Sequence, residues 1–192
     1  MLYAFGFERV GVVAGDMYLV IPAPLPGQEG AERGVRVEVR LLERGELRGS
    51  AYSARPIEVG RPVWRADLLE AADGPPGSLN RAHHHPAFRG WDPGRRVFDE
   101  GMTADPVRWV ADQLSDLGGL LERAGVPADD VTAADAVSLR GCLPEITAAV
   151  ERLLRRVRDG ELGVPPGGEP APVPGTATAP AAPAAGVRAG WL

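Results

Sequence analysis

The sequence predicts an α+β fold in which an antiparallel sheet is followed by helices. In the first half of the chain, apolar and polar residues alternate with a period of two, which is typical of half-buried strands. From Asp105 onward, apolar residues recur with the 3.6-residue period of a helix. Strands that precede a run of helices indicate an α+β class. We expect a single domain over residues 1–160, with about five or six strands within residues 3–86.

The first half of the predicted sheet comes from residues 3–41. Two strands are expected within residues 3–22, separated by a turn at Ala14–Met17. Val35–Leu41 is the clearest strand, because its apolar residues fall on one face and its charged residues on the other. One face of the sheet is therefore expected to be buried and the other solvated, as in many antiparallel sheets. The charged residues expected on the solvated face are Arg36, Glu38 and Arg40.

The second half of the predicted sheet contains the residues of greatest chemical interest. Residues 48–59 and 62–70 are interpreted as two strands joined at Gly60-Arg61-Pro62. In the second of them, Trp64, Ala66 and Leu68 share one face, and Arg65 and Asp67 lie on the other. A loop over residues 71–79 then leads to a short strand within residues 80–86.

Three helices are predicted, at about residues 105–124, 131–141 and 144–159. Asp105 is a suitable N-cap, Pro106 suits the first helical position, and Gly125 suits the stop. Gly141 is expected to end the second helix and Pro144 to begin the third. Residues 161–192 are rich in proline and alanine and poor in charge, so we expect a disordered tail.

Composition excludes several classes of function. The net charge of −5 argues against a general nucleic-acid binder, although a local arginine patch remains compatible with one. All 21 basic residues are arginine, which excludes Schiff-base and Walker-type lysine chemistry and suggests a bacterial genome of high GC content. The lone Cys142 cannot form an internal disulfide, and neither a signal peptide nor a membrane span is evident, so we expect a soluble cytoplasmic protein without membrane contact.

Arg81–Asp99 is the candidate site, because it contains all three histidines of the chain together with arginines and aromatic residues. If residues 80–86 pair antiparallel with 62–70, the alternation of side chains places a set of polar groups on one face. This candidate catalytic set is Arg65, Asp67, Arg81, His83 and His85. The candidate binding residues around it are His84, Arg89, Trp91, Arg95 and Arg96.

Three interpretations of this stretch remain open. The first is metal-independent acid–base catalysis on a phosphodiester, with histidines moving protons, arginines holding phosphate and Trp91 stacking on a base. The second is a metal site of His83, His85 and Asp67, which the neighbouring arginines disfavour, so no metal and no cofactor is expected. The third is a structural loop, in which the histidines bond to carbonyls and Phe88 packs beneath.

The function we expect from the sequence is that of a small partner-binding module, with another protein or a second copy of the chain as partner. The alternatives are a nuclease or phosphodiesterase using the His, Arg and Asp groups, and a protein with a His-x-His metal site. The residues leave open whether the protein is an enzyme.

Overall fold

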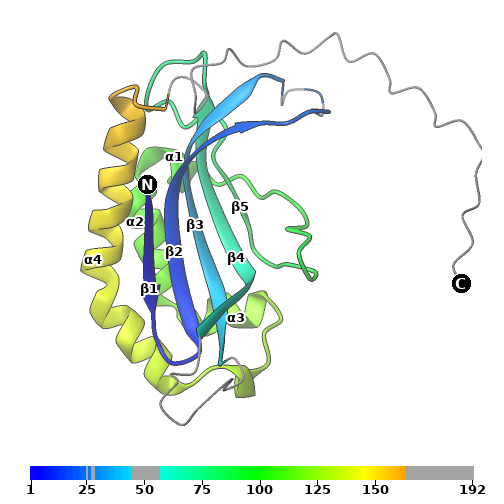
Figure 1. The fold of residues 1–192 in the computed structure, drawn as a ribbon, viewed down its shortest axis with the longest axis vertical. Helices are drawn as coiled ribbons and strands as arrows, with labels where there is room; N and C mark the ends of the chain where they lie inside the picture. The colour runs from blue at the N-terminus through cyan, green and yellow to red at the C-terminus, as the bar shows by residue number, and fades with distance from the viewer. Residues whose placement is uncertain (25, 27–28, 45–56, 163–192) are drawn as a thin grey trace, which may run out of the picture.

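The computed structural model describes residues 1–24, 26, 29–44 and 57–162 (Figure 1). It contains a five-stranded antiparallel sheet with the strands in chain order, followed by helices, which confirms the predicted α+β class. The strands are β1 (Leu2–Gly6), β2 (Val10–Val20), β3 (Ala31–Arg44), β4 (Ile57–Ala71) and β5 (His83–His85). The helices are α1 (Glu100–Ala104), α2 (Pro106–Ser115), α3 (Leu117–Arg123) and α4 (Ala133–Arg158), with a short 3-10 turn at Ala128–Asp130.

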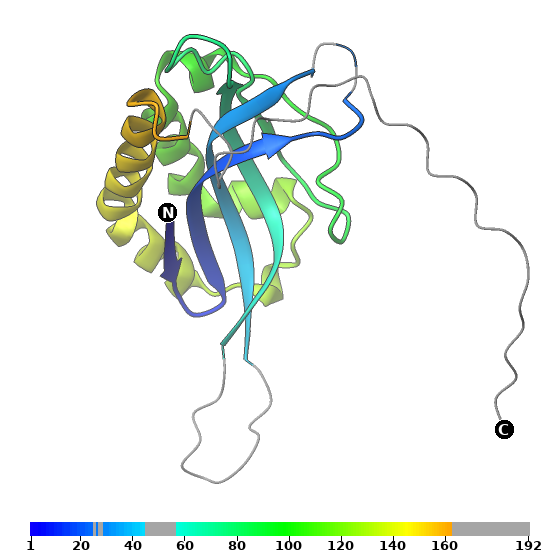
Figure 2. The ribbon, with the colours of Figure 1, turned by 45° about the horizontal axis from the view of Figure 1, so that its top comes forward.

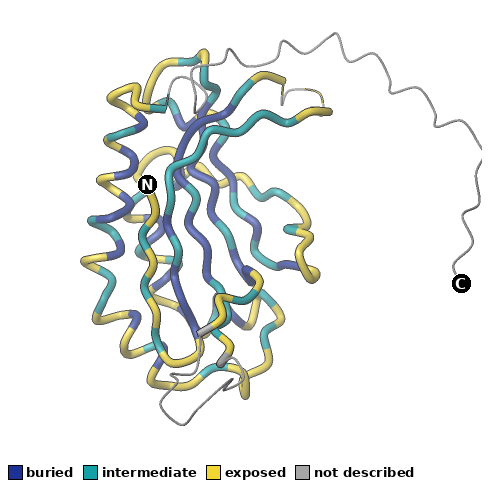
Figure 3. Tube along the Cα trace, viewed as in Figure 1, coloured by how far each residue is buried: buried dark blue, intermediate teal, exposed yellow. Residues whose placement is uncertain are grey.

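The core lies between the sheet and the helices, which gather on one side of it (Figures 1 and 2). The buried positions follow the alternation of the strands, as the dark central strands of Figure 3 show. Trp64 of β4 stacks on Trp109 of α2 with 6.0 Å between ring centroids, and Leu153 of α4 is fully buried in the same core. Each such side chain contributes about 1.5–3 kcal/mol by leaving water.

The other face of the sheet carries the polar residues that alternate with the core positions. In β3 these include Arg36 and Glu38, and in β4 they include Arg65 and Asp67. Arg36 pairs with Asp67 and Glu38 with Arg65 in the β3–β4 register, so opposite charges lie directly across from one another. We call this side the open face, because the described helices pack on the opposite side.

The predicted turn at Ala14–Met17 is wrong. These residues lie inside β2, and the chain reverses earlier, where the Phe7 N–H donates to the Val10 carbonyl at 2.9 Å. Pairing on both edges overrides the local turn signal, because Gly15 lies opposite Leu2 on one side and Arg36 on the other. The Asp16 carboxylate is also held by the N-terminal amino group and by Arg156 of α4.

The predicted break at Gly60-Arg61-Pro62 is also wrong, because β4 runs without interruption through it. An irregularity in the β3–β4 register accommodates the proline, which lies opposite Arg40. Most of the predicted strand 48–59 lies outside the described residues.

The predicted helices 131–141 and 144–159 are one helix, α4, with Pro144 inside it. Gly141 and Pro144 lie on its exposed side, where water can satisfy the carbonyl that loses its N–H partner. The apolar stripe of α4 continues past both residues, with Leu139 before them and Ile146 after them, so packing on the sheet outweighs the local helix breakers.

The predicted helix 105–124 is instead two helices, α2 and α3. They are divided at Asp116, whose carboxylate accepts the N–H of Gly119 and caps α3. The short helix α1 precedes them and was not predicted. The predicted tail lies outside the described residues beyond Leu162. Within the described part of the chain, no helix combines the length and apolarity that crossing a bilayer requires.

Candidate functional site

The pairing of β4 with β5 creates the candidate site. Asp67 lies opposite His83 and Arg65 opposite His85, in the antiparallel register expected from the sequence. The carboxylate, the two imidazoles and the guanidinium therefore share the open face. The assumed pairing is confirmed, and the chemical roles of these residues remain proposals.

Asp67 is the centre of the cluster and is fully buried. Its Oδ1 accepts a hydrogen bond from Arg36 Nε at 2.6 Å, and Arg65 Nε lies 2.8 Å from its Oδ2. The Nε2 atoms of His83 and His85 lie 3.5 and 3.6 Å from the same Oδ2. One carboxylate thus faces two guanidiniums and two imidazoles.

Backbone carbonyls fix the orientation of both imidazoles. The Nδ1 of His83 donates to the Arg81 carbonyl at 2.8 Å, and the Nδ1 of His85 donates to the Pro93 carbonyl at 3.0 Å. A carbonyl can only accept, so in the neutral ring the proton is on Nδ1 and the lone pair is on Nε2. Arg65 Nη2 lies 3.0 Å from the Nε2 of His85 and donates to it.

Burial keeps both rings in the neutral form near pH 7. It lowers the pKa of His83, with Arg96 and Arg65 acting in the same direction. Burial, followed by the charge of Arg65, lowers the pKa of His85 to about 4. The site therefore presents neutral imidazoles beside an acid that two arginines surround.

His84 lies on the other face of β5 from these two histidines. Its ring contacts Trp109 of α2 edge to face, with 5.1 Å between centroids, and burial lowers its pKa. The His84 ring therefore lies on the helix side of the sheet, away from the cluster. Arg81 joins the cluster through its main-chain carbonyl.

Two members of the open face were not recognised as part of the site from the sequence. Arg36, interpreted as a solvated charge, clamps Asp67 and is only 28% exposed. Glu32 is 1% exposed, and neither of its carboxylate oxygens has a hydrogen-bond partner among the described residues. Burial raises the pKa of Glu32, while Arg96 and Arg81 oppose that shift. Register between β3 and β4 is the signal that would have identified Arg36.

The loop Pro86–Phe98 follows β5 and carries the remaining candidate binding residues. Arg89, Trp91 and Arg95 are exposed, and Arg96 is half-buried. Phe88 is buried beneath the guanidinium of Arg65, which lies 5.7 Å from its ring centroid. The loop thus covers one side of the cluster and presents polar and aromatic groups outward.

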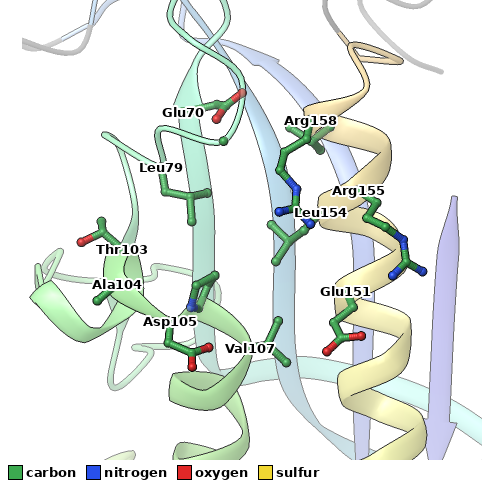
Figure 4. A pocket seen from close by; sticks show the side chains of 13 residues that line it. Glu70, Leu79, Thr103, Ala104, Asp105, Val107, Glu151, Leu154, Arg155 and Arg158 are labelled. Atoms are coloured by element: carbon green, nitrogen blue, oxygen red, sulfur yellow. The ribbon is translucent and has the colours of Figure 1, made fainter.

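A cavity of about 410 Å³ lies on the helix side, between the loop after β4, the start of α2 and the end of α4 (Figure 4). Glu70 contributes a buried carboxylate to its lining, and one of its oxygens accepts from Arg33 Nε at 2.8 Å. Arg155, Arg158 and Glu151 of α4 complete a mixed charged rim. Because Glu70 and Asp67 point to opposite faces of β4, this cavity is separate from the histidine cluster.

Comparison with known protein families, curated proteins and solved structures gave no significant match.

Proposed function

We propose that the protein is a partner-binding module and that its interface is the loop Pro86–Phe98. The observation that carries this proposal is the combination of a fixed backbone with exposed aromatic side chains. Trp91 is 71% exposed and Phe98 is 69% exposed, although the loop is tied to β5 by the Val97–His84 bridge and by the hydrogen bond from His85 to the Pro93 carbonyl. Large aromatic side chains held in water by an ordered loop are typical of binding surfaces.

Hydrogen bonds hold the loop in one shape. Arg89 and Asp92 exchange two backbone hydrogen bonds, of 2.9 and 3.1 Å, around the tip that carries Trp91. Farther along, the Pro93 carbonyl accepts from His85, and Val97 exchanges two backbone hydrogen bonds with His84. A preorganised loop loses little conformational entropy on binding, which favours affinity.

The side chains of the loop indicate the chemistry of the partner. Tryptophan and arginine are the residues most enriched among those that dominate binding energy at protein interfaces. Arg89 and Arg95 are both exposed. The loop is thus a basic and aromatic patch on a chain of net charge −5. A partner segment with an apolar side chain flanked by carboxylates would complement it.

Site-specific photo-crosslinking tests this proposal. A benzophenone amino acid is placed at Trp91 and, as a matched control, at Val137, which is 68% exposed on α4. We expect one discrete crosslinked partner, or a crosslinked dimer, from position 91 and not from 137. Arg89→Glu combined with Arg95→Glu should abolish that product. Equal products from both positions, or a product that the charge reversal leaves unchanged, would contradict the proposal.

A second candidate function is metal-independent hydrolysis of phosphodiesters by the histidine cluster. It is favoured by the convergence of the His83 and His85 Nε2 atoms on Asp67 beside two arginines. Both rings are 2% exposed, so a substrate would have to displace the covering loop. The test is hydrolysis of an activated phosphodiester in chelator. His83→Ala should abolish hydrolysis and His84→Ala should not. Absence of turnover by the unmodified chain would contradict this candidate function.

A further inference from the structure

We propose that Asp67, His83 and His85 bind one divalent transition-metal ion of the Zn²⁺, Co²⁺ and Ni²⁺ type. Each residue offers one ligand atom, and these atoms all lie within 4.8 Å of one another. Two imidazole nitrogens and a carboxylate oxygen are the donor set of many three-ligand sites for such ions, in which water fills the remaining positions. The site is distinct from the loop interface proposed above and does not depend on it.

The hydrogen bonds around the three ligands already match those of a metal site. Histidines that bind a metal almost always donate their other ring N–H to a carbonyl, carboxylate or water. Here the two Nδ1 atoms donate to the carbonyls of Arg81 and Pro93, which leaves both Nε2 atoms as acceptors, at 3.5 and 3.6 Å from Asp67 Oδ2. Arg36 orients the carboxylate through Oδ1, and Oδ2 faces the two imidazoles and the guanidinium of Arg65.

Three acceptor atoms that face one another require a positive group between them. In the structure, that group is the guanidinium of Arg65, with Nε 2.8 Å from Asp67 Oδ2 and Nη2 3.0 Å from His85 Nε2. A metal ion and Arg65 would therefore compete for the same position. The Arg65 side chain is 15% exposed and lies over Phe88, so binding of an ion requires it to rotate outward along the open face.

The donor set also predicts selectivity. Mg²⁺ and Ca²⁺ need about six or more oxygen ligands, whereas this cluster supplies two nitrogens and one carboxylate. The nearby charges of Arg36 and Arg65 repel every divalent cation alike, so only an ion that bonds strongly to nitrogen can offset that repulsion. Binding should therefore strengthen from Mn²⁺ through Co²⁺ to Ni²⁺ and Zn²⁺, and Mg²⁺ and Ca²⁺ should not compete.

The test uses the full chain without a polyhistidine tag, stripped of metal by a chelator that is then removed. Zn²⁺ is titrated by calorimetry, and Co²⁺ by its visible absorption. We expect one ion per chain. His83→Ala and His85→Ala should each weaken binding at least about tenfold, because each removes a ligand. His84→Ala is the matched control on the same strand and should leave binding unchanged.

The competition with Arg65 gives the decisive variant. Arg65→Gln removes a positive charge from the position of the ion and should tighten Zn²⁺ binding by about tenfold or more. Weaker or unchanged binding by this variant would overturn the proposal, as would equal losses in His83→Ala and His84→Ala. If His83→Ala fails to fold, Arg65→Gln still decides, because Arg36 continues to neutralise Asp67.

Discussion

Replacement of Asp67 by asparagine tests whether the open-face cluster is a buried electrostatic unit. The carboxylate has no exposed surface, and its two arginines are 15% and 28% exposed. Removing one partner of a buried ion pair typically costs about 3–5 kcal/mol, because the remaining charge is left desolvated. Arg36 can recover some hydration, whereas Arg65 is more enclosed. We therefore expect a loss near the lower end, about 3 kcal/mol in the free energy of unfolding.

The assay is equilibrium unfolding in urea at pH 7.5 with chelator present, followed by tryptophan fluorescence. A double-mutant cycle separates the charge effect from any change of shape. Arg65→Gln in the Asp67→Asn background removes the uncompensated guanidinium, so the double variant should be more stable than Asp67→Asn alone by about 1 kcal/mol or more. The reasoning is refuted if Asp67→Asn costs less than about 1 kcal/mol, or if the two substitutions are simply additive.

Three further predictions concern other buried or partly buried groups. Asp135 accepts the backbone N–H groups of Arg9 and Val10 and that of Thr132, the N-cap of α4. Asp135→Ala should therefore lower the free energy of unfolding in urea by about 2–4 kcal/mol, and a change below about 1 kcal/mol would contradict this role. In the folded state the pKa of His85 is lowered from 6.5 to about 4, so between these pH values the folded state binds fewer protons than the unfolded state. The free energy of unfolding should therefore decrease by roughly 3 kcal/mol as the pH falls from about 6.5 to 4. His85→Gln should flatten that acid limb, and a wild-type curve that is level between pH 7 and 5 would refute the assignment. Burial and Glu145 raise the pKa of Cys142 to about 11. Its alkylation by iodoacetamide at pH 8 should therefore be about 100-fold slower than that of an ordinary thiol, and Glu145→Gln should accelerate the reaction.

The site could be predicted from the sequence because it depends on one local rule. Side chains alternate along a strand, so antiparallel pairing of residues 80–86 with 62–70 was enough to place His83 and His85 beside Asp67. Arg36 was missed because its role depends on the β3–β4 register, which joins strands separated by a long connection. Distant pairing of this kind has no local signal in the sequence.

The errors in the predicted elements have a common physical cause. The turn expected at Ala14–Met17 and the helix break expected at Pro144 are both sound local preferences, worth at most a few kcal/mol each. In β2 the chain is paired on both edges, and in α4 the apolar stripe is buried on both sides of the proline. Tertiary burial exceeds the local cost in both places, so the element continues.

The metal site and the binding loop are physically connected through His85. Its Nε2 faces Asp67, and its Nδ1 holds the Pro93 carbonyl of the loop that presents Trp91. An ion that fixes the imidazole would strengthen this anchor, and displacement of Arg65 would also remove its contact with Phe88 beneath the loop. The two contacts act on the loop in opposite directions. Whether Zn²⁺ strengthens or weakens partner binding is therefore set by the contact with the larger energy. By linkage, any effect of Zn²⁺ on partner affinity must be matched by an equal effect of the partner on Zn²⁺ affinity. Measuring the partner's affinity with and without Zn²⁺, in wild type and in Arg65→Gln, would show which contact is larger, because the variant keeps only the His85 anchor.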